Sequence, residues 1–223
     1  MNLKSLIFFF FTLFLISCNQ KEKDEVYIFS YFTDNGQHGL HFAYSSDGMI
    51  WESVGNHKSF LSPELGPSKL VRDPCIIKGP DGLFHLVWTT GTWDRIIGYA
   101  SSPDLINWSE QKAIPVMMHE PEARNSWAPE IFYDEANSEY LIFCATTIPG
   151  RHSYVETNGR RLNHRMYYCT TKDFETFSET KFFFNPDFSV IDATILKWQE
   201  KYYGESVSNS KKIRRMYCST YHR

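Results

Sequence analysis

The chain has 223 residues, with 23 lysine and arginine residues against 26 aspartate and glutamate residues and a formal net charge of −3. No block of five or six like charges occurs, which argues against a nucleic-acid partner. Apolar residues make up 42% of the chain, with only 12 glycines and 10 prolines. This composition excludes collagen-like, low-complexity and disordered classes and fits one packed domain.

The N-terminal segment is typical of an export signal. Residues 6–16 are almost entirely apolar, and this run is too short to span a bilayer but has the length of a signal-peptide core. Residues 15–18 (LISC) resemble the bacterial lipobox, in which cleavage precedes a cysteine that carries a diacylglycerol. We expect residues 1–17 to be a removed signal, Cys18 to be lipidated and residues 18–25 to be a tether. An ordinary signal peptide with a coincidental cysteine is the alternative.

This segment also predicts the location of the protein. Acyl chains on Cys18 would hold the domain on a membrane surface without a membrane-spanning helix. We expect an exported bacterial lipoprotein at the outer membrane, facing the periplasm or the cell surface.

The mature chain predicts an all-β fold. Short runs rich in β-branched and aromatic residues recur between turn signals, and no stretch shows a helical period over ten or more residues. Three segments repeat one pattern, in which a strand ends in two hydroxyl residues, followed by an aspartate and, four positions on, an aromatic residue. Each aspartate is expected to accept backbone N–H bonds in the turn, while the ring covers the hairpin end. The pairs are Asp47 and Trp51, Asp104 and Trp108, and Asp173 and Phe177.

A second motif precedes each of the later two hairpins and appears once more. Its copies are Asp73-Pro74-Cys75-Ile76, Ala128-Pro129-Glu130-Ile131 and Asp192-Ala193-Thr194-Ile195. With the strands that follow, they define a four-stranded unit of about 55 to 65 residues, the size of a β-propeller blade. A β-sandwich is the competing architecture, but it does not explain why the same landmarks return in the same order.

The number of units indicates an incomplete propeller of about three blades. Two units are nearly complete, at residues 70–125 and 126–188, with a partial unit before them and another that fades after Tyr203. We expect residues 26–203 to form the domain and residues 204–223, which lose the strand alternation, to be an irregular tail of a truncated gene product. A divergent, exposed tail is the alternative.

The inner strands carry candidate catalytic residues. The first strand of each propeller blade lines the central channel, so Asp73, Glu130 and Asp192 are expected to point towards one axis. Carboxyls that share a cavity suit acid and base catalysis, because repulsion and partial burial separate their pKa values. A lone aspartate before proline is more often a turn residue, and only the recurrence favours the catalytic interpretation.

Aromatic and hydrogen-bonding residues are expected around the same cavity. Their combination suits a sugar ring, which has an apolar C–H face and a hydroxyl rim. The tryptophans serve equally well as hairpin or core packing. The candidates are Trp88, Trp93, Trp127, His85, Arg72, Asn125, His164 and Arg165.

Metal binding through sulfur is not expected. The cysteines after the export segment match no zinc spacing, and three of the four lie in apolar, strand-like runs, where cysteine usually behaves as a small buried hydrophobe. They are Cys75, Cys144, Cys169 and Cys218.

The ordered motifs resemble glycoside hydrolase family 43. The resemblance rests on residues 71–74 (VRDP), 127–130 (WAPE) and 191–194 (IDAT), and covers residues 26–203. Within that family, the chain more closely resembles the arabinosidase-like or β-xylosidase-like lipoproteins of Bacteroidetes type. It implies a five-bladed β-propeller that hydrolyses arabinose- or xylose-containing glycosides with inversion, acting on plant-type or host polysaccharide fragments. The family uses an aspartate base, a second aspartate that tunes pKa, and a glutamate acid.

The resemblance also implies individual roles. Asp73 matches the base, Asp192 the modulating aspartate, and Glu130 a position near the substrate. We place Trp127, Arg72, Trp88 and His164 with Glu130 as substrate-binding residues. A structural calcium ion is possible by family resemblance, and no other cofactor is expected.

One part of the family pattern is missing. The acid glutamate lies in a Glu-Gly-Pro-like motif that this sequence lacks, and one further repeat would place it beyond Arg223. The alternative function is therefore a non-catalytic carbohydrate-binding propeller or an inactive truncated remnant.

Overall fold

The computed structural model describes residues 25–152, 162–186, 188–198, 201–208 and 213–217. Within these ranges the chain forms fourteen β-strands and no helix, so the predicted all-β class is confirmed. The described residues therefore include no helical segment that could span a membrane. The predicted export signal, Cys18 and nearly all of the predicted tether lie outside the described residues.

The strands form four antiparallel sheets, each a simple meander in chain order. The first sheet contains β1 (Tyr27–Tyr31), β2 (His41–Ser45) and β3 (Glu52–Ser53). The second contains β4 (Arg72–Lys78), β5 (Phe84–Thr89), β6 (Ile97–Ser102) and β7 (Lys112–Ile114). The third contains β8 (Trp127–Asp134), β9 (Glu139–Thr147), β10 (His164–Thr171) and β11 (Lys181–Phe184). The fourth contains β12 (Val190–Trp198), β13 (Lys201–Ser208) and β14 (Ile213–Tyr217).

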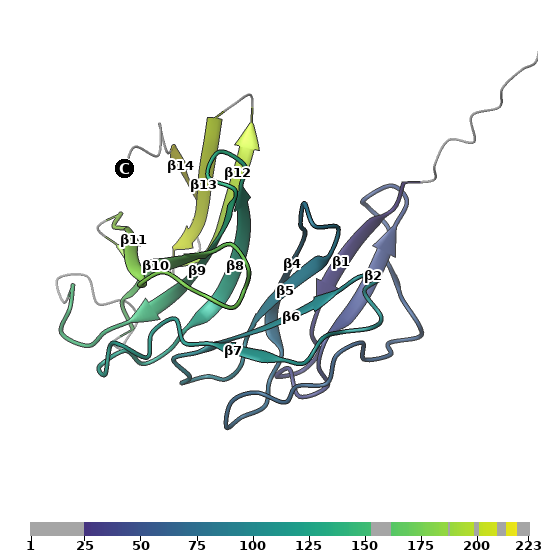
Figure 1. The fold of residues 1–223 in the computed structure, drawn as a ribbon, viewed down its shortest axis with the longest axis horizontal. Coiled ribbons are helices and arrows are strands. Elements are labelled where there is room, and N and C mark those ends of the chain that lie inside the picture. The colour runs from purple at the N-terminus through teal and green to yellow at the C-terminus, as the bar shows by residue number, and fades with distance from the viewer. Residues whose placement is uncertain (1–24, 153–161, 187, 199–200, 209–212, 218–223) are drawn as a thin grey trace, which may run out of the picture.

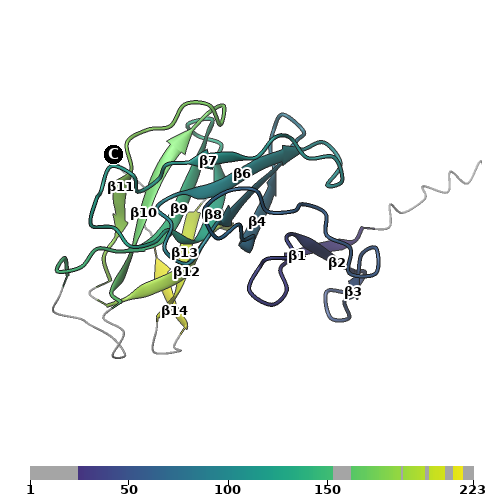
Figure 2. The same ribbon diagram turned by 90° about the horizontal axis from the view of Figure 1, so that it is seen from below.

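The first strands of the four sheets lie next to one another. Strand β4 contacts both β1 and β8, and β8 contacts β12, so successive sheets meet along these inner strands (Figures 1 and 2). Meander sheets arranged in this way are the blades of a β-propeller. Two of the sheets have four described strands and two have three, so among the described residues two blades are complete and two are partial. This confirms the expectation of an incomplete propeller, and the fourteen described strands correspond to between three and four complete blades.

Apolar side chains fill the spaces between successive sheets. Between the first and second sheets, Phe42, Leu86 and Trp88 belong to one buried cluster. Trp88 has no exposed surface, and a Cβ atom added at Gly98 on the neighbouring strand would lie 2.0 Å from its ring. The expectation that Trp88 contacts a sugar is therefore wrong, because its side chain is part of the core.

The three repeated hairpins have the predicted turn geometry. Asp104 Oδ1 accepts the backbone N–H groups of Ile106 and Asn107 at 2.9 and 2.7 Å. The aspartates of the other two hairpins, Asp47 and Asp173, accept the equivalent pairs of N–H groups. These bonds stabilise the ionised carboxylate, and they lower the pKa of Asp104 to about 2.

The C-terminal segment is more regular than its sequence indicates. Residues 201–208 pair with β12, and residues 213–217 pair with residues 203–207. The expectation of an irregular tail at 204–223 is therefore wrong for these strands. Backbone pairing forms them without the alternation of apolar and polar side chains on which strand prediction depends. The remaining residues of the segment, 209–212 and 218–223, lie outside the described residues.

Candidate active site

The repeated inner-strand motif forms the same backbone irregularity in three sheets. The pairing of β4, β8 and β12 with the next strand shifts register at the motif. Asp73, Ala128 and Asp192 occupy the equivalent position and have φ angles of 48°, 46° and 54°. Residues other than glycine adopt this left-handed region at a cost, and such strain is concentrated at functional sites. A bulge of this kind redirects side chains away from the regular strand alternation.

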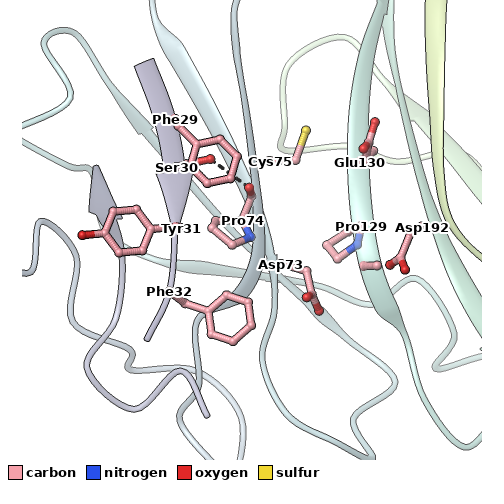
Figure 3. Close-up of a pocket in the computed structure, with 11 residues that line it drawn as sticks. Phe29, Ser30, Tyr31, Phe32, Asp73, Pro74, Cys75, Pro129, Glu130 and Asp192 are labelled. Atoms are coloured by element: carbon pink, nitrogen blue, oxygen red, sulfur yellow. Dashed lines mark hydrogen bonds between the residues drawn. The ribbon is translucent and has the colours of Figure 1, made fainter. Parts of the chain in front are cut away.

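These bulges surround a pocket of about 290 Å³. Residues of β4, β8 and β12 line it together with residues of β1, so four sheets contribute to one cavity (Figure 3). Asp73, Glu130 and Asp192, which the sequence predicts at a common axis, all line this pocket. The complete lining is Phe29, Ser30, Tyr31, Phe32, Asp73, Pro74, Cys75, Ala128, Pro129, Glu130 and Asp192.

Asp73 is half-buried and receives a hydrogen bond. The Oγ1 of Thr89 donates to Asp73 Oδ2 at 3.1 Å. Burial raises the pKa of Asp73, while the neighbouring Arg72 guanidinium and the Thr89 hydrogen bond act in the opposite direction. Burial is the largest of these effects, so the carboxylate is a stronger base than an exposed aspartate.

The other two carboxyls have the same tendency. Burial raises the pKa of Glu130, and the charge of Asp192 raises it further, against a hydrogen bond with Thr194. Desolvation and then the charge of Asp73 raise the pKa of Asp192, the most exposed of the three. The three carboxyls are thus electrostatically linked, and the ionisation of one makes the ionisation of its neighbour harder.

An aromatic wall completes the pocket on the side of the first sheet. Phe29, Tyr31 and Phe32 line it, and the Arg72 guanidinium lies 5.9 Å from the centre of the Phe32 ring. Figure 3 shows these rings on one side of Asp73, with Glu130 and Asp192 on the other. Aromatic faces opposite carboxyls offer a sugar both stacking and hydrogen bonding. None of the sequence motifs includes this wall, although the run YIFSYF at residues 27–32 is a signal for it.

Trp127 and His164 lie near the pocket but do not line it. The Trp127 Nε1 donates to the carbonyl oxygen of Thr92 at 2.7 Å, and its ring lies 5.0 Å from that of His164. His164 is 2% exposed and shares a 2.9 Å hydrogen bond with Thr147 Oγ1. Burial lowers the pKa of His164 to about 4. Direct sugar contact by His164 is therefore a wrong expectation, because the side chain is buried. Contact by Trp127 stays a prediction.

Three further candidates are also interior residues. Arg165 and Asn125 have no exposed surface, and His85 is 2% exposed. Asn125 bonds the backbone of Ala145 and Thr147, which is a structural role. These three do not line the pocket, and direct sugar contact by them is excluded by their burial. Arg72 adjoins Asp73, so its contact with substrate stays a prediction, as does that of the 57% exposed Trp93.

The described carboxyls of the pocket do not lie close enough together to form a metal-binding group. Within the described part of the chain, no group of three or more histidine, cysteine, aspartate or glutamate residues is placed to hold a metal ion. The calcium ion that the resemblance allows stays a prediction without a ligand set.

Burial raises the pKa of Cys75, which lines the pocket, to about 12, so its thiol is protonated at neutral pH.

A second pocket, of about 250 Å³, lies between the second and third sheets. Asp81, His85, Tyr140 and Glu175 are among its lining residues. His85 Nδ1 and Tyr99 Oη are hydrogen-bonded at 2.9 Å, and the His85 Nε2 lies 3.2 Å from both Asp81 and Tyr140. Its buried polar groups thus satisfy one another, whereas the first pocket combines partly buried carboxyls with exposed aromatic surface.

Three carboxyls that meet in one pocket of a β-propeller are an arrangement that suits acid and base chemistry. The chain matches the family described as "Probable glycosyl hydrolase domain" over residues 22–222, and it belongs to this family. The match extends through the strands of the fourth sheet, so the C-terminal segment is part of the family's domain.

Individual relatives agree with the family. The chain is 27% identical over 117 residues to an α-L-arabinofuranosidase of Bifidobacterium longum, a match that covers 49% of this chain and 11% of that protein. An α-L-arabinofuranosidase structure from Clostridium thermocellum has a TM-score of 0.57 at 11% identity, covering 83% of this chain and 58% of the other. A bifunctional GH43-CE protein from Bacteroides eggerthii has a TM-score of 0.56 at 13% identity, covering 82% and 21%.

These structural matches identify the fold, a β-propeller of the five-bladed class. The chain spans about a tenth of the length of the curated relative and just over half of the Clostridium structure. The activities in the names of these relatives belong to those proteins.

The raised pKa of Glu130 predicts how stability depends on pH. Because its pKa is higher in the folded than in the unfolded chain, the folded state binds the proton more tightly. Its contribution to the free energy of unfolding is therefore greatest below the ordinary pKa of about 4 and is lost as the pH rises through the folded value. Glu130→Gln cannot ionise, so it should raise the melting temperature at pH 7 but not at pH 3.

Thermal unfolding of both chains at these two pH values checks this expectation. Glu122→Gln, at an exposed position outside the pocket, is the matched control and should show no such difference. A melting temperature of Glu130→Gln that equals or falls below that of the wild-type chain at pH 7 would contradict the burial of a charged carboxyl here.

Proposed function

We propose that the pocket is the active site of a glycoside hydrolase that acts on arabinose- or xylose-containing glycosides. The observation that carries this proposal is the meeting of Asp73, Glu130 and Asp192 in one pocket with an aromatic wall. Membership of a glycosyl hydrolase family supports the activity, and the α-L-arabinofuranosidase relative supports the arabinose-containing substrates.

Each carboxyl has a role in this proposal. Asp73 accepts a proton from a water molecule while the water oxygen attacks the anomeric carbon, and the bond from that carbon to the glycosidic oxygen breaks. The attack inverts the configuration, as in sites where the two catalytic carboxyls are about 6.5 to 9.5 Å apart. Asp192 holds the substrate and shifts pKa values through its charge, and Glu130 binds a sugar hydroxyl.

The leaving oxygen must also gain a proton. Among the described residues that line the pocket, no fourth carboxyl is available as the proton donor. Loss of general acid catalysis typically costs about 10²-fold to 10⁴-fold in rate. We therefore expect the chain by itself to hydrolyse activated aryl glycosides, whose leaving groups need little protonation, much better than natural linkages.

Export and lipidation complete the proposal. We propose that Cys18 is the acylated N-terminus and anchors the domain to the outer membrane, where it meets oligo- or polysaccharide. The support is the sequence at residues 15–18.

The direct test is an assay of the purified chain on nitrophenyl α-L-arabinofuranoside and β-D-xyloside. Release of nitrophenol above the uncatalysed rate, with Asp104→Asn as active as the wild-type chain, is the expected result. Asp104 is the matched aspartate because it lies in a surface hairpin. Calorimetric binding of arabino-oligosaccharides without nitrophenol release would instead favour the non-catalytic sugar-binding function. If the folded protein neither hydrolyses the aryl glycosides nor binds the oligosaccharides, both the catalytic and the sugar-binding function are contradicted.

A further inference from the structure

Thr89 is a buried residue next to the candidate base. It ends β5, has 1% of its surface exposed, and lies beside the bulge of β4. Its Oγ1 is 3.1 Å from Asp73 Oδ2 and 3.0 Å from the backbone nitrogen of Ala128. One hydroxyl thus contacts the carboxylate of one sheet and the backbone of the next.

The chemistry of the partners fixes the direction of both hydrogen bonds. A backbone N–H can only donate, so the hydroxyl must accept from Ala128. The single hydroxyl proton then remains for Asp73, which accepts it when ionised. Rotation of the hydroxyl proton towards another acceptor would remove the hydrogen bond to the partly buried Asp73 carboxylate, a cost that favours the arrangement as it stands.

The two partners of Thr89 are also the two strained positions of adjoining sheets. Asp73 and Ala128 both have left-handed φ angles, at 48° and 46°. Such conformations persist where the surroundings hold them in place. The Thr89 hydroxyl is a direct link between the two bulges, so it holds the Asp73 side chain relative to the third sheet.

We propose that Thr89 is the positioning residue of Asp73, whose hydroxyl, oriented by the Ala128 N–H, holds Oδ2 and leaves Oδ1 to accept the proton of the attacking water. This inference rests on the proposed function for the role of Asp73, but the orientation of the carboxylate is testable without catalysis. It goes beyond the sequence motifs, none of which includes Thr89.

The experiment compares Thr89→Val, which keeps the shape and removes the hydroxyl, with Thr89→Ser, which keeps the hydroxyl. Carbon NMR titration of the side-chain carboxyls in the full chain should show a higher pKa for Asp73 in Thr89→Val, because a hydrogen bond to the charged form is lost. Thr89→Ser should restore the wild-type titration. If Thr89→Val does not fold, Thr89→Ala removes the same hydroxyl with less crowding and takes its place.

Kinetics give a second measurement. Thr89→Val should lower kcat by about 10-fold to 100-fold, the effect of one hydrogen bond to a charged group. KM should change little, and the acidic limb of the pH profile should move to higher pH. A purely structural role would lower melting temperature without moving the pH profile.

The neighbouring Thr90 provides the matched control. It is equally buried and donates to Asp94, which does not line the pocket, at 2.9 Å. Thr90→Val should leave both the Asp73 titration and the pH profile unchanged.

The outcomes separate this inference from the proposed function. A shifted Asp73 titration in Thr89→Val, in a chain without any hydrolysis, would support the contact and contradict the function. Wild-type hydrolysis that depends on Asp73, with an unchanged titration and pH profile in the Thr89 variants, would overturn the role of Thr89 alone.

Discussion

Replacing Asp73 with asparagine should lower kcat/KM on aryl arabinosides by about 10²-fold to 10⁴-fold, the range for loss of a general base. The amide has the shape of the carboxylate but cannot accept a proton from water. It also keeps an oxygen that can accept the hydrogen bond of Thr89, so the fold should remain intact. Initial rates under conditions where the variant and wild-type chains have the same circular dichroism spectrum measure the effect.

The comparison with Asp192 separates the two roles. Asp192→Asn removes a charge that is coupled to Asp73 and Glu130, so it should lower the rate less and shift the pH optimum as well. The neutral amide would no longer raise the pKa of Glu130. If Asp73→Asn retained the wild-type rate while Glu130→Gln had none, the base would be misassigned.

Trp88→Ala should be the most destabilising of these substitutions, at about 3 to 5 kcal/mol, the usual cost of removing a large core aromatic. The ring is completely buried between the first and second sheets. Urea denaturation measures the loss, which should amount to a large part of a typical domain's stability.

Trp93→Ala is the control for this prediction. Trp93 is 57% exposed, so its removal should change stability by much less. A Trp88→Ala chain with wild-type stability and a raised KM would show that Trp88 is a sugar contact after all, and that the packing of the first two sheets is different.

The fold is predictable from the repeats, because the inner-strand motif and the hairpin with its turn-forming aspartate recur in the same order along the chain. The same periodicity brought Asp73, Glu130 and Asp192 to one axis. Residues 27–32 could not be assigned to the site in the same way because they belong to a partial unit, so no second copy marked them as an inner strand. The sequence does not predict the strands at 201–208 and 213–217, because it lacks the alternation of apolar and polar residues there, although the backbones pair.

The errors at individual side chains have a different cause. Both faces of a propeller blade are buried against neighbouring blades, so the alternation along a strand identifies the two faces but not which side chains reach the cavity. For this reason the sequence predicts Trp88 and His164 at the pocket, although both side chains are interior. Thr89 contacts Asp73 and Ala128 across two sheets, and a contact between residues so distant in sequence leaves no local pattern.

Carbon NMR titration of all side-chain carboxyls with an arabino-oligosaccharide tests most directly whether this pocket is the sugar site. We predict that the carboxyl resonances of Asp73, Glu130 and Asp192 shift along one binding curve with a single dissociation constant. The carboxyl resonance of Asp104, in its surface hairpin, should stay unchanged. Shifts confined to Asp81 in the second pocket, or saturation without any shift at the three inner-strand carboxyls, would contradict the assignment of the active site.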